Sequence, residues 1–219
     1  MAIHTRKHIL PLLPVLALAS VAPNAFPAAQ LGYASLREMA IYLILPSAAL
    51  LLAVAAVSLL RGGRVGGVIF RGAAAGAVAT LALEAIRYPG YLLGTMPGNL
   101  PELMGVLLLD RFAQGPSTAS TLAGFAYHFW NGASFGIVFT ALLDVFSTRP
   151  TPARATAYGV LIGIGFLVSP VVQSLGIGLF GVDFGWRFAA TVLSAHAAFG
   201  LALWWMLRRL IGTARTAQP

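Results

Sequence analysis

Residues 39–60 read MAIYLILPSAALLLAVAAVSLL, a run of 22 residues without a charged side chain. An α-helix of about 20 residues crosses the roughly 30 Å hydrocarbon core of a bilayer, because each residue adds about 1.5 Å. A run this long is typical of a transmembrane helix and exceeds what a buried helix of a soluble protein needs. This segment therefore predicts a membrane protein.

The whole chain has the same character. Hydrophobic residues make up 58% of its 219 residues and charged residues only 9%, whereas a soluble domain carries about 25% charged residues. A water-soluble fold is therefore excluded. We expect an all-α, polytopic membrane helix bundle with six transmembrane helices, because the chain contains six apolar runs, at 9–22, 39–60, 65–86, 122–143, 155–175 and 188–207.

The first run has two interpretations. A basic start and a short apolar stretch that ends in ASVA at Ala22 are also typical of a cleaved secretory signal. The charge-free stretch continues past Pro23 to Ala29, however, and this favours a retained first helix. Cleavage would leave five spans with the same topology.

The positions of the basic residues predict the orientation. Lys and Arg are retained on the cytoplasmic side of a membrane, and alternate threading with a cytoplasmic N-terminus places ten of them on that side: Arg6, Lys7, Arg61, Arg64, Arg71, Arg149, Arg154, Arg208, Arg209 and Arg215. Four fall outside: Arg37, Arg87, Arg111 and Arg187. We therefore expect both termini in the cytoplasm of a bacterial inner (plasma) membrane. The net charge of +8 is spread along the chain, so it does not indicate a nucleic-acid partner.

Residues 88–120 are expected to form an outer loop, because their prolines and glycines interrupt a helix. Within this loop, Asn99 followed by Pro101 and Glu102 predicts a helix start over 100–112, with Asn99 as the cap. That helix is too short to span. We expect it to lie on the outer face, or to dip into the bilayer as a re-entrant segment where protein covers its backbone.

An internal repeat organises the rest of the chain. The third and fifth helices carry GxxxG spacing, while the fourth and sixth carry histidine and glycine four residues apart. The order predicts a duplicated helical hairpin in a four-helix core at 63–211, after an N-terminal hairpin at 1–62 and before a cytoplasmic tail at 212–219. The glycines expected at helix contacts are Gly72, Gly76, Gly132, Gly136, Gly159, Gly163 and Gly200.

On these motifs, together with the turn GIGLFGVDFG and the final helix LSAHAAFGLALWW, the sequence resembles a family of small, uncharacterised bacterial integral membrane proteins grouped as a domain of unknown function. The resemblance covers about Gly67 to Trp205. It implies a duplicated four-helix core and no established activity.

Two histidines are the main candidates for chemistry. His128 and His196 lie about seven or eight residues into the fourth and sixth helices from their outer ends. An ionisable group inside a membrane is a functional candidate, although a neutral histidine that donates one interhelical hydrogen bond explains the pattern equally well. Asn131, three residues after His128, completes a polar pocket or bonds a backbone carbonyl.

A carboxylate and an arginine end the third helix. Glu84 and Arg87 are three residues apart, which allows an ion pair. In the functional interpretation, Glu84 is a third ligand or proton acceptor near His128 and His196. Two cofactors fit these residues: haem b between the two imidazoles, with Arg87 and Arg187 near its propionates, or a divalent metal held by His128, His196 and Glu84. The absence of cysteine excludes iron–sulfur clusters and thiolate sites.

Three functions are compatible with the sequence. No nucleophilic-serine, phosphate-loop or zinc-protease motif occurs in the sequence, which disfavours an enzyme. Weak polarity and glycine-rich faces favour an accessory or scaffold subunit that packs against another membrane protein or a second copy in the lipid bilayer. The alternatives are a haem- or metal-binding protein that uses His128 and His196, and a transporter of a small neutral solute.

The predicted topology leads to a labelling experiment on intact cells. Single cysteines introduced at Gly63, Thr151 and Thr213 are expected to be shielded from a membrane-impermeant thiol reagent, and one at Thr118 is expected to react. The labelling is specific because the chain has no cysteine of its own. The reverse pattern would contradict the orientation.

Overall fold

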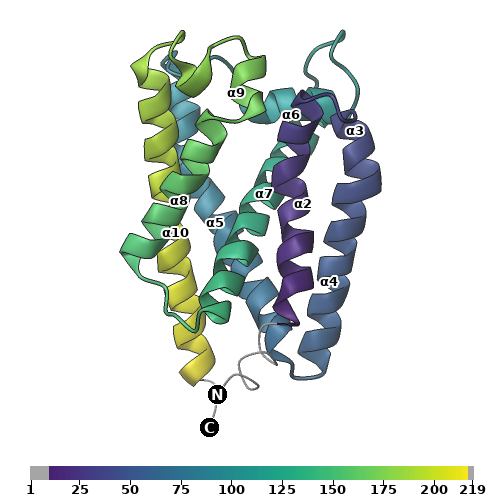
Figure 1. Cartoon of the computed structure of the whole chain (residues 1–219), viewed down its shortest axis with the longest axis vertical. Helices are drawn as coiled ribbons and strands as arrows, with labels where there is room; N and C mark the ends of the chain where they lie inside the picture. Colours follow the sequence, from purple (N-terminus) through teal and green to yellow (C-terminus); the bar gives the residue numbers. More distant parts are fainter. Residues whose placement is uncertain (1–9, 217–219) are drawn as a thin grey trace.

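The computed structural model describes residues 10–216, which form helices joined by turns and loops and contain no strand (Figure 1). This confirms the all-α fold class. Arg6, Lys7 and residues 217–219 lie outside the described residues. The elements are α2 (Leu12–Gln30), α3 (Leu36–Met39), η1 (Ala40–Ile44), α4 (Leu45–Leu60), α5 (Arg64–Leu92), α6 (Leu100–Leu108), α7 (Thr118–Val145), α8 (Pro152–Leu167), α9 (Pro170–Ser174), η2 (Leu179–Gly181) and α10 (Trp186–Thr216).

Five helical segments are long and apolar enough to cross a membrane: Leu12–Gln30, Leu36–Leu60, Arg64–Leu92, Pro152–Ser174 and Trp186–Ile211. The expected sixth, α7, has 28 residues and is therefore about 42 Å long, but histidine, asparagine, serine and threonine lower its apolarity. It lies inside the bundle, packed against α2, α5 and α6. Neighbouring helices therefore cover its polar side chains.

The first helix is longer than the run at 9–22 predicts. α2 continues through Pro23 and Pro27 to Gln30, and the Tyr127 hydroxyl of α7 donates a hydrogen bond to the Ala22 carbonyl at 2.7 Å. This contact joins α2 to the bundle at the predicted cleavage position. The prolines remain inside the helix because its neighbours hold it.

Two further prolines modify the spans. Pro46 lacks the N–H that would bond the Tyr42 carbonyl, and the backbone just before it widens into the π-helical turn η1. The residue before Pro170, Ser169, is extended (ψ 158°), as proline disfavours the helical region for its predecessor. The predicted run at 155–175 is therefore a broken helix, α8 followed by α9.

The outer loop is partly helical, which corrects two predicted boundaries. α5 continues through Pro89 to Leu92 instead of ending before residue 88. α6 ends at Leu108 instead of residue 112, because Asp110 adopts a left-handed conformation (φ 53°). At the other end of the chain, α10 reaches Thr216, so the helix continues into the predicted tail at 212–219.

Glycines allow two pairs of helices to approach closely. A Cβ on Gly72 of α5 would lie 2.6 Å from Ile137 Cα of α7, and one on Gly76 would collide with the Gly132 carbonyl. In the same way, Gly159 of α8 faces the His196 carbonyl of α10, and Gly200 of α10 faces the Ala155 carbonyl. Each pair thus packs backbone against backbone. Gly136 and Gly163 lie at the same two contacts.

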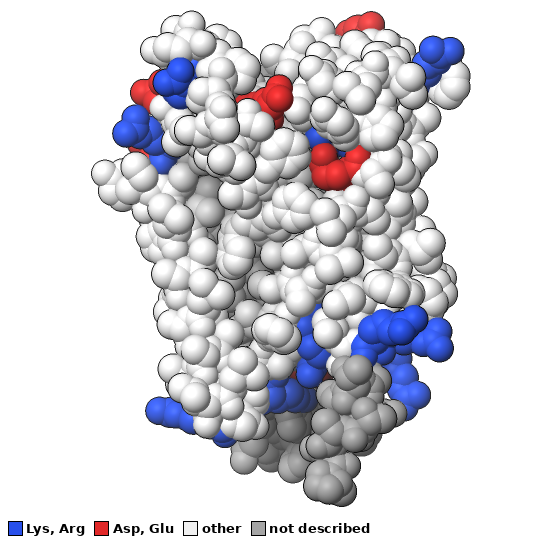
Figure 2. Space-filling view, turned by 180° about the vertical axis from the view of Figure 1, so that it is seen from behind, with Lys and Arg blue, Asp and Glu red and all other residues white. Residues whose placement is uncertain are grey.

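The two ends of the bundle differ in charge. α2 begins and α10 ends at the same end of the molecule (Figure 1). Figure 2 shows basic side chains gathered at that end and most acidic side chains at the opposite one. Asp144 is an acid at the basic end, where it pairs with Arg64 at 3.1 Å. The distribution has the asymmetry that the positive-inside rule describes.

The close contact of α5 with α7 leads to a stability prediction. Gly76→Ala is expected to lower the free energy of unfolding by about 1–3 kcal/mol, because the added methyl group forces two backbones apart. Gly165→Ala in α8 is the matched control, since a Cβ there meets no atom within 4 Å. The measurement is thermal unfolding in detergent; equal midpoints for the two variants would contradict the packing.

Candidate functional site

A buried ion pair lies near the C-terminal end of α5. One turn of helix separates Glu84 from Arg87, and the guanidinium group forms a fork: Nε donates to Glu84 Oε1 and Nη2 to Glu84 Oε2, both at 2.6 Å. The Arg87 side chain is 5% exposed and that of Glu84 13%. The predicted pair is therefore present, and it lies inside the protein.

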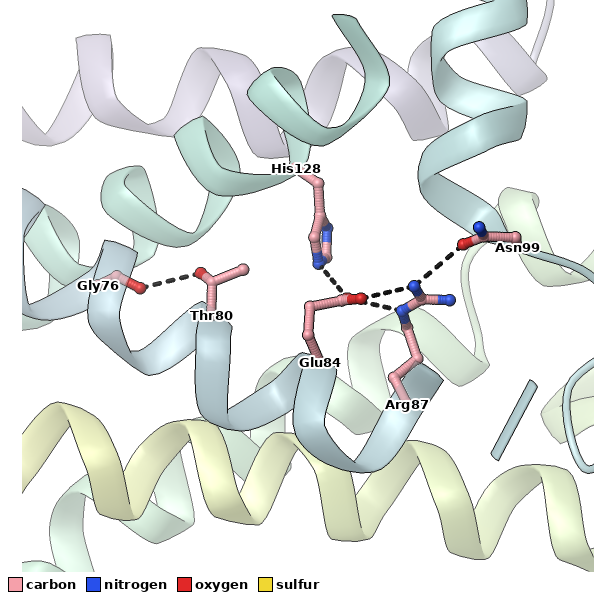
Figure 3. Close-up of polar contacts among 6 residues, drawn as sticks. All are labelled: Gly76, Thr80, Glu84, Arg87, Asn99 and His128. Atoms are coloured by element: carbon pink, nitrogen blue, oxygen red, sulfur yellow. Dashed lines mark hydrogen bonds and ion pairs between the residues drawn. The ribbon is translucent and has the colours of Figure 1, made fainter. Parts of the chain in front are cut away.

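His128 of α7 reaches the same carboxylate. Its Nε2 lies 2.9 Å from Glu84 Oε1 (Figure 3), so one carboxylate contacts groups from two helices. The expected proximity of Glu84 to a histidine is thus found for His128. One turn before Glu84 in α5, the Thr80 hydroxyl donates a hydrogen bond to the Gly76 carbonyl at 2.9 Å. This hydroxyl therefore has its partner within α5.

Asn99 has a different role from the predicted one. It stands at the N-cap position of α6, but its side chain makes no capping hydrogen bond. Instead, its Oδ1 accepts a hydrogen bond from Arg87 Nη2 at 3.0 Å (Figure 3). A hydrogen bond from a charged donor is stronger than one from a backbone amide, so the arginine takes the oxygen away from the helix start. Asn99 thereby ties α6 to the end of α5.

Beside this cluster lies a cavity of about 340 Å³. Its wall is mostly apolar and includes Phe26, Leu83, Met96, Phe135, Phe166 and Phe199. Polar side chains interrupt the wall from several helices: Asn24, Thr80, Arg87, His128, Asn131, Ser169 and His196. A mainly apolar volume with a few convergent polar groups is the usual composition of a small-molecule site.

Besides His128 Nε2, whose contact is the Glu84 carboxylate, three polar atoms of residues in this wall are buried without a hydrogen-bond partner. They are Arg87 Nη1, Asn131 Oδ1 and Ser169 Oγ. An unpaired buried donor or acceptor costs about 1–3 kcal/mol. The three residues that carry these atoms all line the cavity.

His196 of α10 lines the same cavity as His128. Its Nδ1 lies 2.8 Å from the Val192 carbonyl of its own helix, and its ring stacks on Phe166 with the centroids 6.4 Å apart. The interpretation of His196 as a neutral, hydrogen-bonded packing residue fits these contacts. The two histidines nevertheless line one cavity.

The arrangement does not favour the two predicted cofactors. The Nε2 of His128 is engaged by Glu84, so a role as axial haem ligand through that atom requires this contact to break. Among the described residues, no three His, Asp or Glu side chains are close enough together to hold a metal ion. His128, His196 and Glu84 therefore do not form a ready metal centre.

Arg187 is not part of the site. It lies at the exposed start of α10, 6.0 Å from the centre of the Trp186 ring, and it does not line the cavity. The sequence reading placed it near Arg87 only because both residues belong to outer helix ends. Asn131, by contrast, does line the cavity, and its Oδ1 lacks a partner.

Sequence reasoning missed the contribution of two segments. Asn24, Phe26 and Pro27 of α2 line the cavity, although no residue of the N-terminal hairpin at 1–62 was among the predicted site residues. Ser169 lines it at the break between α8 and α9. The available signals were a polar residue in an apolar run, at Asn24, and a serine directly before Pro170.

Comparison with known proteins places the chain in a family without an assigned activity. The model of DUF6789, described as a family of unknown function, matches residues 67–218, and the chain belongs to this family. No curated protein matches the chain. No solved structure matches it either.

The cluster leads to a prediction for a double-mutant cycle. Arg87→Met is expected to lower the free energy of unfolding by about 3–5 kcal/mol, because it leaves the Glu84 carboxylate without its guanidinium partner. Adding Glu84→Gln to Arg87→Met is expected to recover part of the loss, since no charge is then stranded. Unfolding in mixed detergent micelles measures this, and additive effects of the two substitutions would contradict the coupling.

Proposed function

We propose that this member of a family of unknown function is a six-span inner-membrane protein that binds a small, largely apolar molecule inside its helix bundle. The observation that carries the proposal is the cavity of about 340 Å³ between α2, α5, α7, α8 and α10. An empty space of this size forgoes the dispersion contacts that a packed interior makes. A protein that served only to pack helices would gain nothing from keeping it.

Two features support the spans and their orientation. α7 is long enough to cross a bilayer, and its packing against α2, α5 and α6 covers its polar residues, so we count it as the sixth span. The basic end of the bundle (Figure 2) faces the cytoplasm under the positive-inside rule. The Glu84 cluster, near the opposite end of α5, then lies towards the outer side.

The two close helix pairs support a duplicated core. In each pair a helix with GxxxG spacing packs on a helix with HxxxG spacing: α5 on α7, and α8 on α10. An axis along the membrane normal would relate two such pairs. Such an axis accounts for the position of His128 and His196 at one shared cavity.

The ligand reaches the cavity from the bilayer in this proposal. α2 and α8 both contribute to the wall, through Phe26 and Pro27 on one side and Gly165 and Phe166 on the other. α2 packs chiefly on α7 and α4, and α8 chiefly on α10, so the cavity lies between two helix groups. An apolar molecule dissolved in lipid needs no aqueous route to such a site.

Transport of a small neutral solute is the second candidate, and the broken span favours it. The segment Pro152–Ser174 is interrupted at Val168 and Ser169, and Ser169 lines the cavity. Discontinuous helices are common at the binding sites of transporters. Transport would use the same cavity, and flux of the bound molecule into proteoliposomes would separate it from binding alone.

A cavity-filling variant tests the proposed function. Gly165→Leu is expected to abolish saturable binding of tritiated 2-methylnaphthalene to the protein in phosphatidylcholine nanodiscs, because Gly165 lines the cavity and a Cβ there meets no atom within 4 Å, which leaves room for the larger side chain to occupy it. Leu161→Phe is the matched control, since Leu161 lies on the same helix and is 65% exposed but does not line the cavity.

Empty nanodiscs provide the background for partitioning into lipid. Binding by the wild type and by Leu161→Phe, with at least a tenfold loss in Gly165→Leu, is the expected outcome. Equal binding by all three proteins, or no binding above empty nanodiscs, would contradict the proposed function.

A further inference from the structure

We infer that the molecule bound in this cavity carries an uncharged oxygen acceptor at one end of an apolar body, and that Arg87 Nη1 donates a hydrogen bond to that oxygen. The inference rests on the ligand-binding function proposed above. It adds the chemical class of the ligand and the residue that recognises it.

The guanidinium group of Arg87 has one nitrogen to spare. Its Nε and Nη2 are held by Glu84 and Asn99, whereas Nη1 has no partner, and Arg87 lines the cavity. The residue is only 4% exposed, so bulk water does not satisfy this donor. Figure 3 shows Nη1 on the side of the guanidinium group away from Glu84. A ligand atom at Nη1 must therefore be a hydrogen-bond acceptor.

The charge balance of the cluster favours an uncharged acceptor. Glu84 already neutralises Arg87 through two short hydrogen bonds, so the pair has no net charge. A carboxylate placed at Nη1 would bring a second negative charge close to Glu84 in an apolar wall, where charges are poorly solvated. A carbonyl or hydroxyl oxygen accepts the same bond without this repulsion.

The rest of the wall fits the apolar body of such a molecule. Phe135, Phe166 and Phe199 line the cavity with aromatic rings, and apolar residues make up most of the remaining wall. Because Arg87 donates to one end of the molecule and the aromatic rings surround the other, the site is expected to orient an amphipathic molecule.

The test compares two probes of similar size and shape in the same nanodiscs. Tritiated menadione is a bicyclic molecule with two carbonyl oxygens, and tritiated 2-methylnaphthalene is its counterpart without oxygen. The chain has no cysteine, so the quinone cannot arylate a thiol in it. The quantity measured is the ratio of the two dissociation constants after subtraction of empty nanodiscs.

The wild type is expected to favour menadione, and the ratio is expected to fall about tenfold in the double variant Glu84→Gln with Arg87→Met, which removes the donor without stranding a charge. A ratio that stays at the wild-type value in this variant would overturn the inference and leave the proposed function intact. If Gly165→Leu binds both probes as the wild type does, it is the proposed function that fails.

The single variant Glu84→Gln gives a second, independent outcome. It leaves the charge of Arg87 without its carboxylate partner, so binding of 2-naphthoate relative to menadione is expected to rise about tenfold. An unchanged preference would overturn the inference, because the charge of Glu84 would then have no part in recognition. Because Arg87 is retained in this variant, the outcome does not depend on loss of the donor.

Discussion

The fork between Glu84 and Arg87 is the contact on which the end of the bundle opposite the start of α2 depends. An ionised carboxylate or guanidinium group is costly in an apolar environment unless it is paired and hydrogen-bonded. Both of these charges lie inside the protein, so each needs the other. Glu84 also contacts His128 of α7, and Arg87 also donates a hydrogen bond to Asn99 at the start of α6. One ion pair on α5 thereby links three parts of the chain.

Glycine contacts also hold α5 against α7, at positions before Glu84 in α5. Gly72 and Gly76 bring the backbones of α5 and α7 into contact. Further along α5, the side chain of Glu84 contacts His128 of α7. His196 lies at the glycine-mediated contact between α8 and α10, opposite Gly159 and Gly163. Between the two close-packed pairs, and beside α2, the cavity remains open. The helices are thus closely packed at the glycines and leave a cavity beside Glu84 and Arg87.

Sequence reasoning predicted what depends on neighbours along the chain. Charge-free runs predicted the helices, and the spacing of Glu84 and Arg87 predicted their pairing, since both follow from the periodicity of a single helix. The contacts of Asn99 and Tyr127 depend on distant segments, so local patterns did not reveal them. Asn99 matched a capping pattern, yet a charged donor twelve residues earlier takes its oxygen. Arg187 was misplaced because depth in the membrane does not specify direction around the bundle.

The central claim is that an apolar molecule occupies the cavity between α2 and α8, next to Arg87. Anomalous X-ray diffraction from lipid-grown crystals soaked with 2-bromonaphthalene tests this most directly, because bromine marks the position of the probe. The account predicts a bromine peak inside the bundle, among Phe135, Phe166 and Arg87. Bromine peaks confined to the lipid-facing surface, with side chains filling the space between α2 and α8, would contradict it.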